Sequence, residues 1–178
     1  TDKIFKPKDI QLINIFKKYN SIDKYFIGRK FKIETNDKLL KEHGDTCCYV
    51  SLKQSKNRKK YIKYKLKKDQ KFWKVISPTA VKGAYSGFNE LFILNENEIH
   101  SASYVSFKVN SKNEAESLFS YLKTNLVNKL LSIRKISQTI SKDTVKYIPI
   151  IPLDRTWDNN SVYDYFNLTN EDIKYIDS

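Results

Sequence analysis

The feature that most constrains the fold is an apolar repeat of helical spacing between Glu114 and Gln138. Five aliphatic residues recur there at steps of three or four: Leu118, Leu122, Leu126, Leu130 and Ile133. This spacing places a broad apolar stripe along one helix, or along two helices joined near Thr124. Acidic residues are absent between Ser117 and Lys142, whereas basic ones recur. The repeat therefore predicts a helical layer with one side against a core and the other side positively charged.

Short segments rich in β-branched and aromatic residues precede this layer. They predict strands over 31–35, 46–53, 59–68, 72–76, 91–94 and 103–109. Residues 59–68 alternate most regularly, with Ile62, Tyr64 and Leu66 on one side and mostly lysines on the other. We predict that this segment forms a hairpin with 46–53, around a turn at 55–58.

The remaining segments complete the predicted architecture. A helix is predicted over 8–19, with four residues facing inward: Ile10, Leu12, Ile13 and Phe16. Residues 37–43 predict a helical turn ended by Gly44. The run 147–152 predicts an extended segment across the core, and two short helices are predicted after it, the second capped by Thr169.

These elements predict an α+β fold: a mainly antiparallel sheet covered on one face by helices, with a short helical C-terminal appendage. The predicted organisation is an N-terminal helical segment over 1–30, an α+β domain over 31–152 and the appendage over 153–178. Met is absent from the chain, including position 1. We therefore expect the chain to be an excised part of a longer protein. No apolar run reaches the length of a membrane span, so we expect a cytoplasmic protein that does not contact a membrane.

A formal net charge of +13 indicates a polyanionic partner, with nucleic acid first. The basic residues are nearly all lysine, which A/T-biased codons would also produce, so their distribution matters more than their number. Residues 53–74 hold eleven basic residues and one acidic residue, Asp69. Such a hairpin can lie against phosphates or enter a groove. The alternative is a solvated edge whose lysines oppose sheet-to-sheet association.

Three segments supply the predicted DNA contacts. The hairpin contributes Lys56, Arg58, Lys59, Lys60, Tyr61, Lys63 and Lys65. The loop between two predicted strands contributes Lys82, Tyr85 and Ser86, and the end of the helical layer contributes Arg134, Lys135 and Gln138. Arginine reads guanine and glutamine reads adenine in the major groove, so Arg58, Arg134, Lys135 and Gln138 are the predicted base contacts.

The residues needed for catalysis or metal binding are not grouped in this chain. Cys47 and Cys48 are adjacent, so that on a strand they point to opposite faces and do not share one metal; we expect buried or half-buried thiols. Neither histidine lies in a recognisable catalytic context, and no carboxylates show a nuclease spacing. We therefore predict no catalytic residue, no metal and no cofactor within these residues.

Four sequence pieces follow one another in the second half of the chain: SYLKT (120–124), LLSIRKISQ (130–138), YIPIIPLDRTW (147–157) and YDYFNLTNEDIKYI (163–176). Over roughly residues 103–176 this series resembles the C-terminal region of type II adenine-specific DNA methyltransferases and fused restriction-modification enzymes. In those families a similar series closes the target-recognition part.

The resemblance implies a division of labour. This chain would recognise double-stranded DNA, and a catalytic domain N-terminal to it would bind S-adenosylmethionine and flip the target adenine. The glycine-rich cofactor turn and the Asn/Asp-Pro-Pro-aromatic loop of amino-methyltransferases are absent from these residues. Two alternatives stay open: the recognition domain of a type II restriction endonuclease or bifunctional enzyme, and a basic module that binds RNA or a protein.

Overall fold

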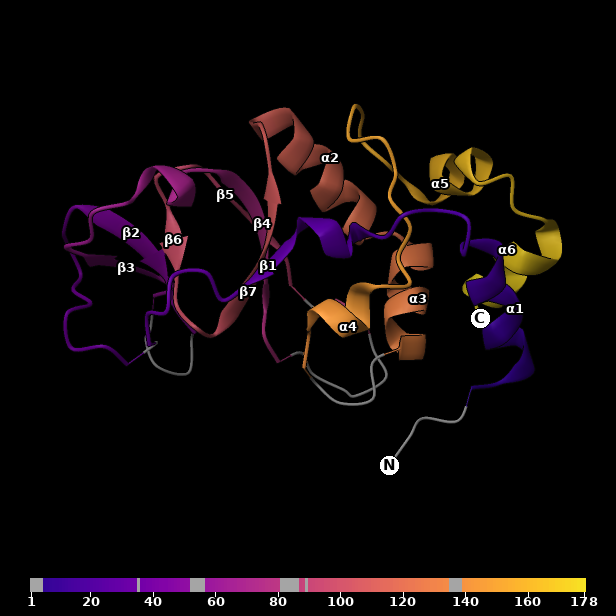
Figure 1. The fold of residues 1–178 in the computed structure, drawn as a ribbon, viewed down its shortest axis with the longest axis horizontal. Coiled ribbons are helices and arrows are strands. Elements are labelled where there is room, and N and C mark those ends of the chain that lie inside the picture. Colours follow the sequence, from indigo (N-terminus) through magenta and orange to yellow (C-terminus); the bar gives the residue numbers. More distant parts are fainter. Residues whose placement is uncertain (1–4, 35, 52–56, 81–86, 89, 135–138) are drawn as a thin grey trace.

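The computed structural model describes every residue except 1–4, 35, 52–56, 81–86, 89 and 135–138. The described part contains two β-sheets and six α-helices. A small sheet forms one end of the molecule, a larger sheet lies beside it, and the helices form the other end (Figure 1). The predicted α+β class is therefore confirmed. Among the described residues, no helix combines the length and the apolar character that crossing a bilayer requires.

The larger sheet is antiparallel and has the strand order β1-β7-β4-β5. Its strands are β1 (Phe26–Gly28), β4 (Trp73–Pro78), β5 (Phe92–Leu94) and β7 (Tyr104–Val109). The register of β1 on β7 shifts between Phe26 and Gly28, where Gly28 has a φ of +62°. Only glycine adopts this conformation without a steric cost, so it permits the irregular pairing at this edge.

Helices cover one face of this sheet. Val75 pairs with Phe107 in the register of β4 and β7, and both side chains enter the core under α2 (Lys112–Leu122) and α3 (Asn125–Arg134). The Ser111 side chain accepts a hydrogen bond from the Glu114 N–H and caps α2. The five aliphatic residues of the apolar repeat are all buried, which confirms the predicted stripe. The stripe runs along two helices, α2 and α3, rather than along one.

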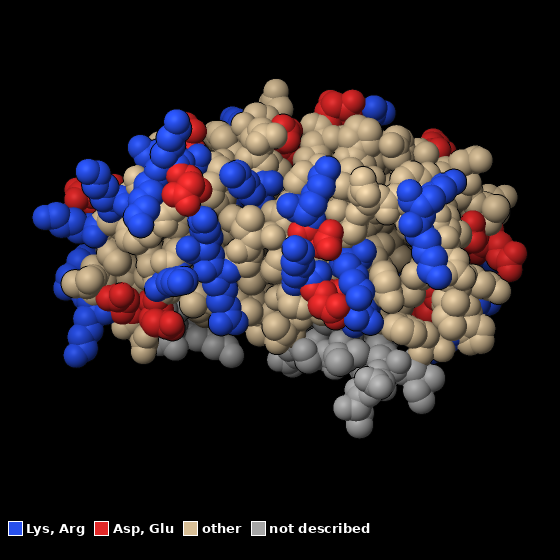
Figure 2. Space-filling model, in the orientation of Figure 1, with Lys and Arg blue, Asp and Glu red and all other residues tan. Residues whose placement is uncertain are grey.

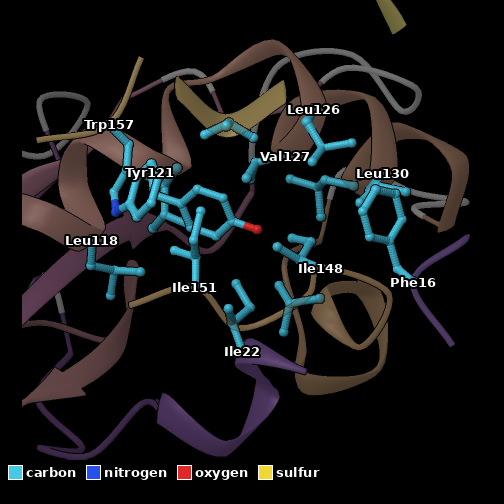
Figure 3. Close-up of a cluster of buried hydrophobic side chains, with 14 of the residues drawn as sticks. Phe16, Ile22, Leu118, Tyr121, Leu126, Val127, Leu130, Ile148, Ile151 and Trp157 are labelled. Atoms are coloured by element: carbon cyan, nitrogen blue, oxygen red, sulfur yellow. The ribbon is translucent and has the colours of Figure 1, made fainter. Parts of the chain in front are cut away.

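An extended segment crosses this core, as predicted from 147–152. Ile148 and Ile151 are buried on it, and the Tyr121 hydroxyl donates a 2.7 Å hydrogen bond to the Pro149 carbonyl. Figure 3 shows the Tyr121 ring among aliphatic side chains from the helices and from this segment. The segment also pairs with the connection after α1, since the Ile150 N–H donates to the Asn20 carbonyl at 2.7 Å.

Four further helices pack around the same core: α1 (Pro7–Ile15), α4 (Lys142–Val145), α5 (Asn159–Tyr165) and α6 (Asn170–Ile176), together with the 3₁₀ turn η1 (Ile22–Tyr25). Thr169 caps α6, as predicted, by accepting a hydrogen bond from the Asp172 N–H. Phe166 meets Phe16 edge to face at 5.1 Å. The two ends of the chain therefore share one core.

The second sheet covers the other face of the larger one. Its strands are β2 (Thr46–Tyr49), β3 (Lys59–Ile62) and β6 (Ile99–His100), in the order β3-β2-β6, with β2 parallel to β6. A separate cluster around Cys48, Ile62 and Phe72 forms its core. The prediction of one mainly antiparallel sheet thus holds for the larger sheet, while the hairpin belongs to a mixed second sheet.

Several predicted boundaries are wrong. The strand predicted over 59–68 ends at Ile62, because its partner β2 begins at Thr46, opposite Ile62. The described residues of 31–35 form no strand and those of 37–43 form no helical turn, although Phe31 and Ile33 are buried. Ile10 is 47% exposed on α1 instead of facing inward.

We expect Tyr121→Phe to lower the free energy of unfolding by about 1–3 kcal/mol, because the buried Pro149 carbonyl loses its donor. Chemical denaturation would measure this change. Tyr165→Phe is the matched control, since Tyr165 is 42% exposed and the substitution keeps its ring. Equal stability of the two variants would contradict the prediction.

Candidate nucleic-acid interface

The β2–β3 hairpin holds most of the predicted DNA contacts. Its strands pair in register, with Cys47 opposite Tyr61, and the Val50 N–H donates to the Arg58 carbonyl at 2.7 Å. The outer edge of β3 is paired as well, because Tyr61 and Lys41 exchange two main-chain hydrogen bonds of 2.8 Å. A Cβ on Gly44 would lie only 3.0 Å from the Tyr61 Cβ, so a side chain there would require a small shift of Tyr61.

Arg58 connects this hairpin to the larger sheet. Its guanidinium donates to the Tyr104 hydroxyl and to a Glu90 carboxylate oxygen, each at 2.8 Å, and lies 5.2 Å from the centre of the Phe92 ring. The Tyr104 hydroxyl in turn donates to the Val50 carbonyl at 3.1 Å. Arg58 therefore has a structural role at the base of the hairpin, and its predicted base contact stays a prediction.

The two lysines that follow Arg58 also have partners within the protein. The Lys59 ammonium lies 5.7 Å from the centre of the Tyr49 ring. Lys60 forms an ion pair with Glu42, and only 18% of its side chain is exposed. Tyr61 is half-buried. These contacts orient the side chains along the hairpin and reduce the charge that Lys60 presents to a partner.

Beyond β3 a row of lysines faces solvent. Lys63, Lys65 and Lys67 are exposed, and they alternate with Ile62, Tyr64 and Leu66, which pack on the second core. The Thr46 hydroxyl donates to the Tyr64 carbonyl at 3.0 Å and holds this continuation in place. No member of the row forms an ion pair with a carboxylate that the structure describes. The alternation predicted for 59–68 thus persists beyond the strand.

Basic side chains extend over the visible face of the molecule. Figure 2 shows them densely grouped at the end that the second sheet forms, with acidic side chains interspersed. Lys30, for example, lies 3.4 Å from Asp69. Part of the positive charge is therefore neutralised locally by ion pairs, whereas the lysine row of 63–67 has no such pair with a described carboxylate.

Arg134 lies at the C-terminal end of α3, apart from the hairpin (Figure 1). One of its terminal nitrogens donates to both carboxylate oxygens of Asp143, at 2.8 and 3.0 Å. These hydrogen bonds, followed by those from Lys146, lower the pKa of the Asp143 carboxyl. The guanidinium also lies 5.4 Å from the centre of the Tyr147 ring, so that Arg134 joins α3 to α4.

Six predicted contacts lie outside the described residues: Lys56, Lys82, Tyr85, Ser86, Lys135 and Gln138. The described residues next to two of these segments meet, because Ala80 and Thr139 form an antiparallel bridge. The Ile140 N–H donates to the Thr79 carbonyl at 2.7 Å beside it. The described residues 79–80 and 139–140 therefore lie side by side.

Gly87 and Phe88 contact α3. The Phe88 N–H donates to the Asn128 side-chain oxygen at 2.6 Å. A Cβ at Gly87 would lie 2.0 Å from that oxygen, so a side chain there requires Asn128 to move. Asn128 also donates to the Leu122 and Thr124 carbonyls, which orients its amide.

A buried polar cluster between the two sheets was not predicted from the sequence. Lys74, one of the basic residues of 53–74, is fully buried and donates to the Phe72 and Asn95 carbonyls at 2.9 Å each. Burial lowers the pKa of its ammonium group to about 8. The position of this lysine between hydrophobic residues on a predicted strand could have indicated burial. The sequence analysis counted it instead with the other basic residues of 53–74.

His100 is the second member of this cluster. The Ser101 carbonyl, 2.9 Å from Nδ1, can only accept, so Nδ1 carries a proton; in the neutral ring Nε2 then accepts from the Ser106 hydroxyl. Burial lowers the pKa of His100 from 6.5 to about 4. The hydrogen bond to Ser101 raises this pKa, and the nearby charge of Lys74 lowers it further. His100 thus serves packing rather than proton transfer.

Nothing in the described residues assembles a metal centre, since no three His, Cys, Asp or Glu side chains there are close enough to hold an ion. The cysteines lie as predicted, with Cys48 buried and Cys47 half-buried, and neither forms a disulfide. Burial raises the pKa of the Cys48 thiol to about 12, so it is an inert core residue.

Comparison with known proteins gives no match, either to a family model or to a curated protein.

We expect Arg58→Lys to lower the free energy of unfolding by about 1–3 kcal/mol, because one ammonium does not reach both Tyr104 and Glu90 in the same geometry. A double-mutant cycle with Tyr104→Phe would measure the coupling, expected at about 0.5–3 kcal/mol. Arg29→Lys, at an exposed position, is the control. Additive effects of the Arg58 and Tyr104 changes would contradict the proposed link.

His100 predicts a specific sensitivity to acid. Its pKa is lower in the folded state than in the unfolded state, so the unfolded state takes up the proton first as the pH falls from about 6.5 to about 4. This difference removes up to about 3 kcal/mol of folding free energy. We expect His100→Gln to be less stable at pH 7 but to lose less stability on acidification.

Denaturant titrations between pH 7 and 4 would test this expectation. His43→Gln, at an exposed position, controls for the loss of a histidine and is expected to follow the wild-type curve. A His100→Gln curve parallel to the wild-type curve would show that this ring does not cause the acid sensitivity.

Proposed function

We propose that this chain binds double-stranded DNA through the face that carries its basic hairpin. The observation that carries the proposal is the lysine row, Lys63, Lys65 and Lys67, which is exposed and has no ion pair with a described carboxylate. Ammonium groups on an ordered backbone suit phosphate binding, which provides affinity and a salt dependence without sequence information.

Sequence would be read elsewhere on the same molecule. The best candidates are Lys82, Tyr85, Ser86, Lys135 and Gln138, because described residues next to them in the chain meet at the Ala80–Thr139 bridge. Lysine hydrogen-bonds to guanine and glutamine to adenine, so this set includes donors and acceptors for both bases. Arg58 and Arg134 would then act mainly by holding the hairpin and α3 in position.

The resemblance of residues 103–176 supports a narrower proposal. We infer that the chain is the target-recognition part of an adenine-specific DNA methyltransferase in a cytoplasmic restriction-modification system. A catalytic domain of the parent protein would bind S-adenosylmethionine and methylate the flipped adenine. This chain would only bind the DNA and recognise the target sequence. The first alternative is a parent protein that is a restriction endonuclease or a bifunctional restriction-modification enzyme. This chain would recognise the target sequence in that protein as well.

The test is selection of the 178-residue chain on randomised duplex DNA at about 50 and 200 mM salt. We expect a short enriched sequence at both concentrations. We also expect replacement of the lysine row by glutamine to weaken binding to every duplex alike. The salt slope should fall by about 0.9 for each phosphate that the variant no longer neutralises.

A matched control replaces three exposed lysines remote from the hairpin, Lys18, Lys123 and Lys174, by glutamine and keeps the same net charge as the row variant. Equal weakening in the two triple variants would show that only total charge matters. Binding without an enriched sequence would remove the recognition role. Equal affinity for single-stranded RNA and duplex DNA would favour the RNA-binding alternative.

A further inference from the structure

An apolar groove lies between α1 and residues 146–149, at the opposite end of the molecule from the basic hairpin (Figure 1). Its volume is about 360 Å³. Ile13, Phe16 and Ile148 form buried parts of its wall. Ile10 also lines it and is 47% exposed, although the sequence pattern predicted an inward position. The groove therefore leaves apolar surface in water that a ligand would cover.

The charged residues of the groove are of one sign. Lys17 and Lys146 line it, and no acidic side chain is among its described lining residues. Lys146 shares its charge with Asp143, 3.2 Å away, whereas Lys17 forms no ion pair with a described carboxylate. An anionic group would thus meet two cations beside an apolar cavity.

We infer that this groove binds a small amphipathic anion, namely a carboxylate with an apolar tail. The apolar walls favour the tail, and the two lysines favour the carboxylate over an alcohol or an amine. The volume falls within the range of small-molecule sites, about 300–1,000 Å³. A polyanion such as DNA would leave the apolar walls uncovered, so this site is separate from the proposed DNA interface and does not depend on it.

Titration with sodium decanoate, followed by amide chemical shifts, tests the inference. We expect saturable shifts confined to α1, to 19–21 and to 146–149. Affinity should rise about fourfold per methylene from hexanoate to decanoate while the tail fills the groove. Decyltrimethylammonium carries the opposite charge on a tail that is one carbon longer, and it should still bind at least about tenfold more weakly.

Variants separate the apolar and ionic contributions. Ile10→Glu puts a carboxylate at an exposed position of the groove, and we expect it to weaken decanoate binding by at least about tenfold. Leu39→Glu is the matched control, because Leu39 is 66% exposed and lies outside the groove. Lys17→Gln with Lys146→Gln should reduce the preference for decanoate over decyltrimethylammonium.

Several results would overturn the inference. Shifts elsewhere, equal binding of the two detergent-like probes, or no saturation at millimolar decanoate would each do so. Sedimentation of the unliganded chain gives a further check. If wild type dimerises and Ile10→Glu does not, a second copy covers the groove. DNA selection with the Ile10→Glu variant should be unchanged, so that failure of this site and failure of the proposed function remain distinguishable.

Discussion

One buried hydrogen bond, from the Tyr121 hydroxyl to the Pro149 carbonyl, supports the extended segment that crosses the core. An extended segment inside a core needs partners for its main-chain polar groups, because unpaired ones are costly to bury. Pro149 has no N–H to satisfy, and the neighbouring Ile148 carbonyl accepts from the Ile22 N–H at 2.9 Å. The apolar run 147–152 can therefore pass under α2 and α3 and join helices from both ends of the chain.

Periodicity in the sequence predicted which side of an individual helix or strand is buried. The apolar repeat of 118–133 identified the buried sides of α2 and α3. The strand predicted over 103–109 corresponds to β7, where Val105 and Phe107 face the helical core and Tyr104 faces the other side. Side chains on one helix or strand follow its repeat regardless of what lies beside it. The cap at Thr169 was also predicted, because it depends only on a hydrogen bond to the first turn of its own helix.

Contacts between distant segments were not predictable. The end of β3 depends on where β2 begins, and Arg58 is held by Glu90 and Tyr104, more than thirty residues away along the chain. Lys74 counted as surface charge in the sequence because a lysine pattern does not show which ammonium groups are enclosed by a second sheet. Of the candidate site, the hairpin and its lysine alternation were predicted, whereas the packing roles of its arginines were not.

This difference changes how the net charge should be interpreted. Lys60 and Arg134 have carboxylate partners within 4 Å, and Lys74 is buried against carbonyl groups. Their charge is largely used in holding the protein together. The lysines of 63–67 alternate with Tyr64 and Leu66, which are half-buried against the second core, and have no such partners among the described carboxylates. Under the proposed function these three lysines are the expected phosphate contacts, so the strength of DNA binding is expected to depend on them more than on the total of +13.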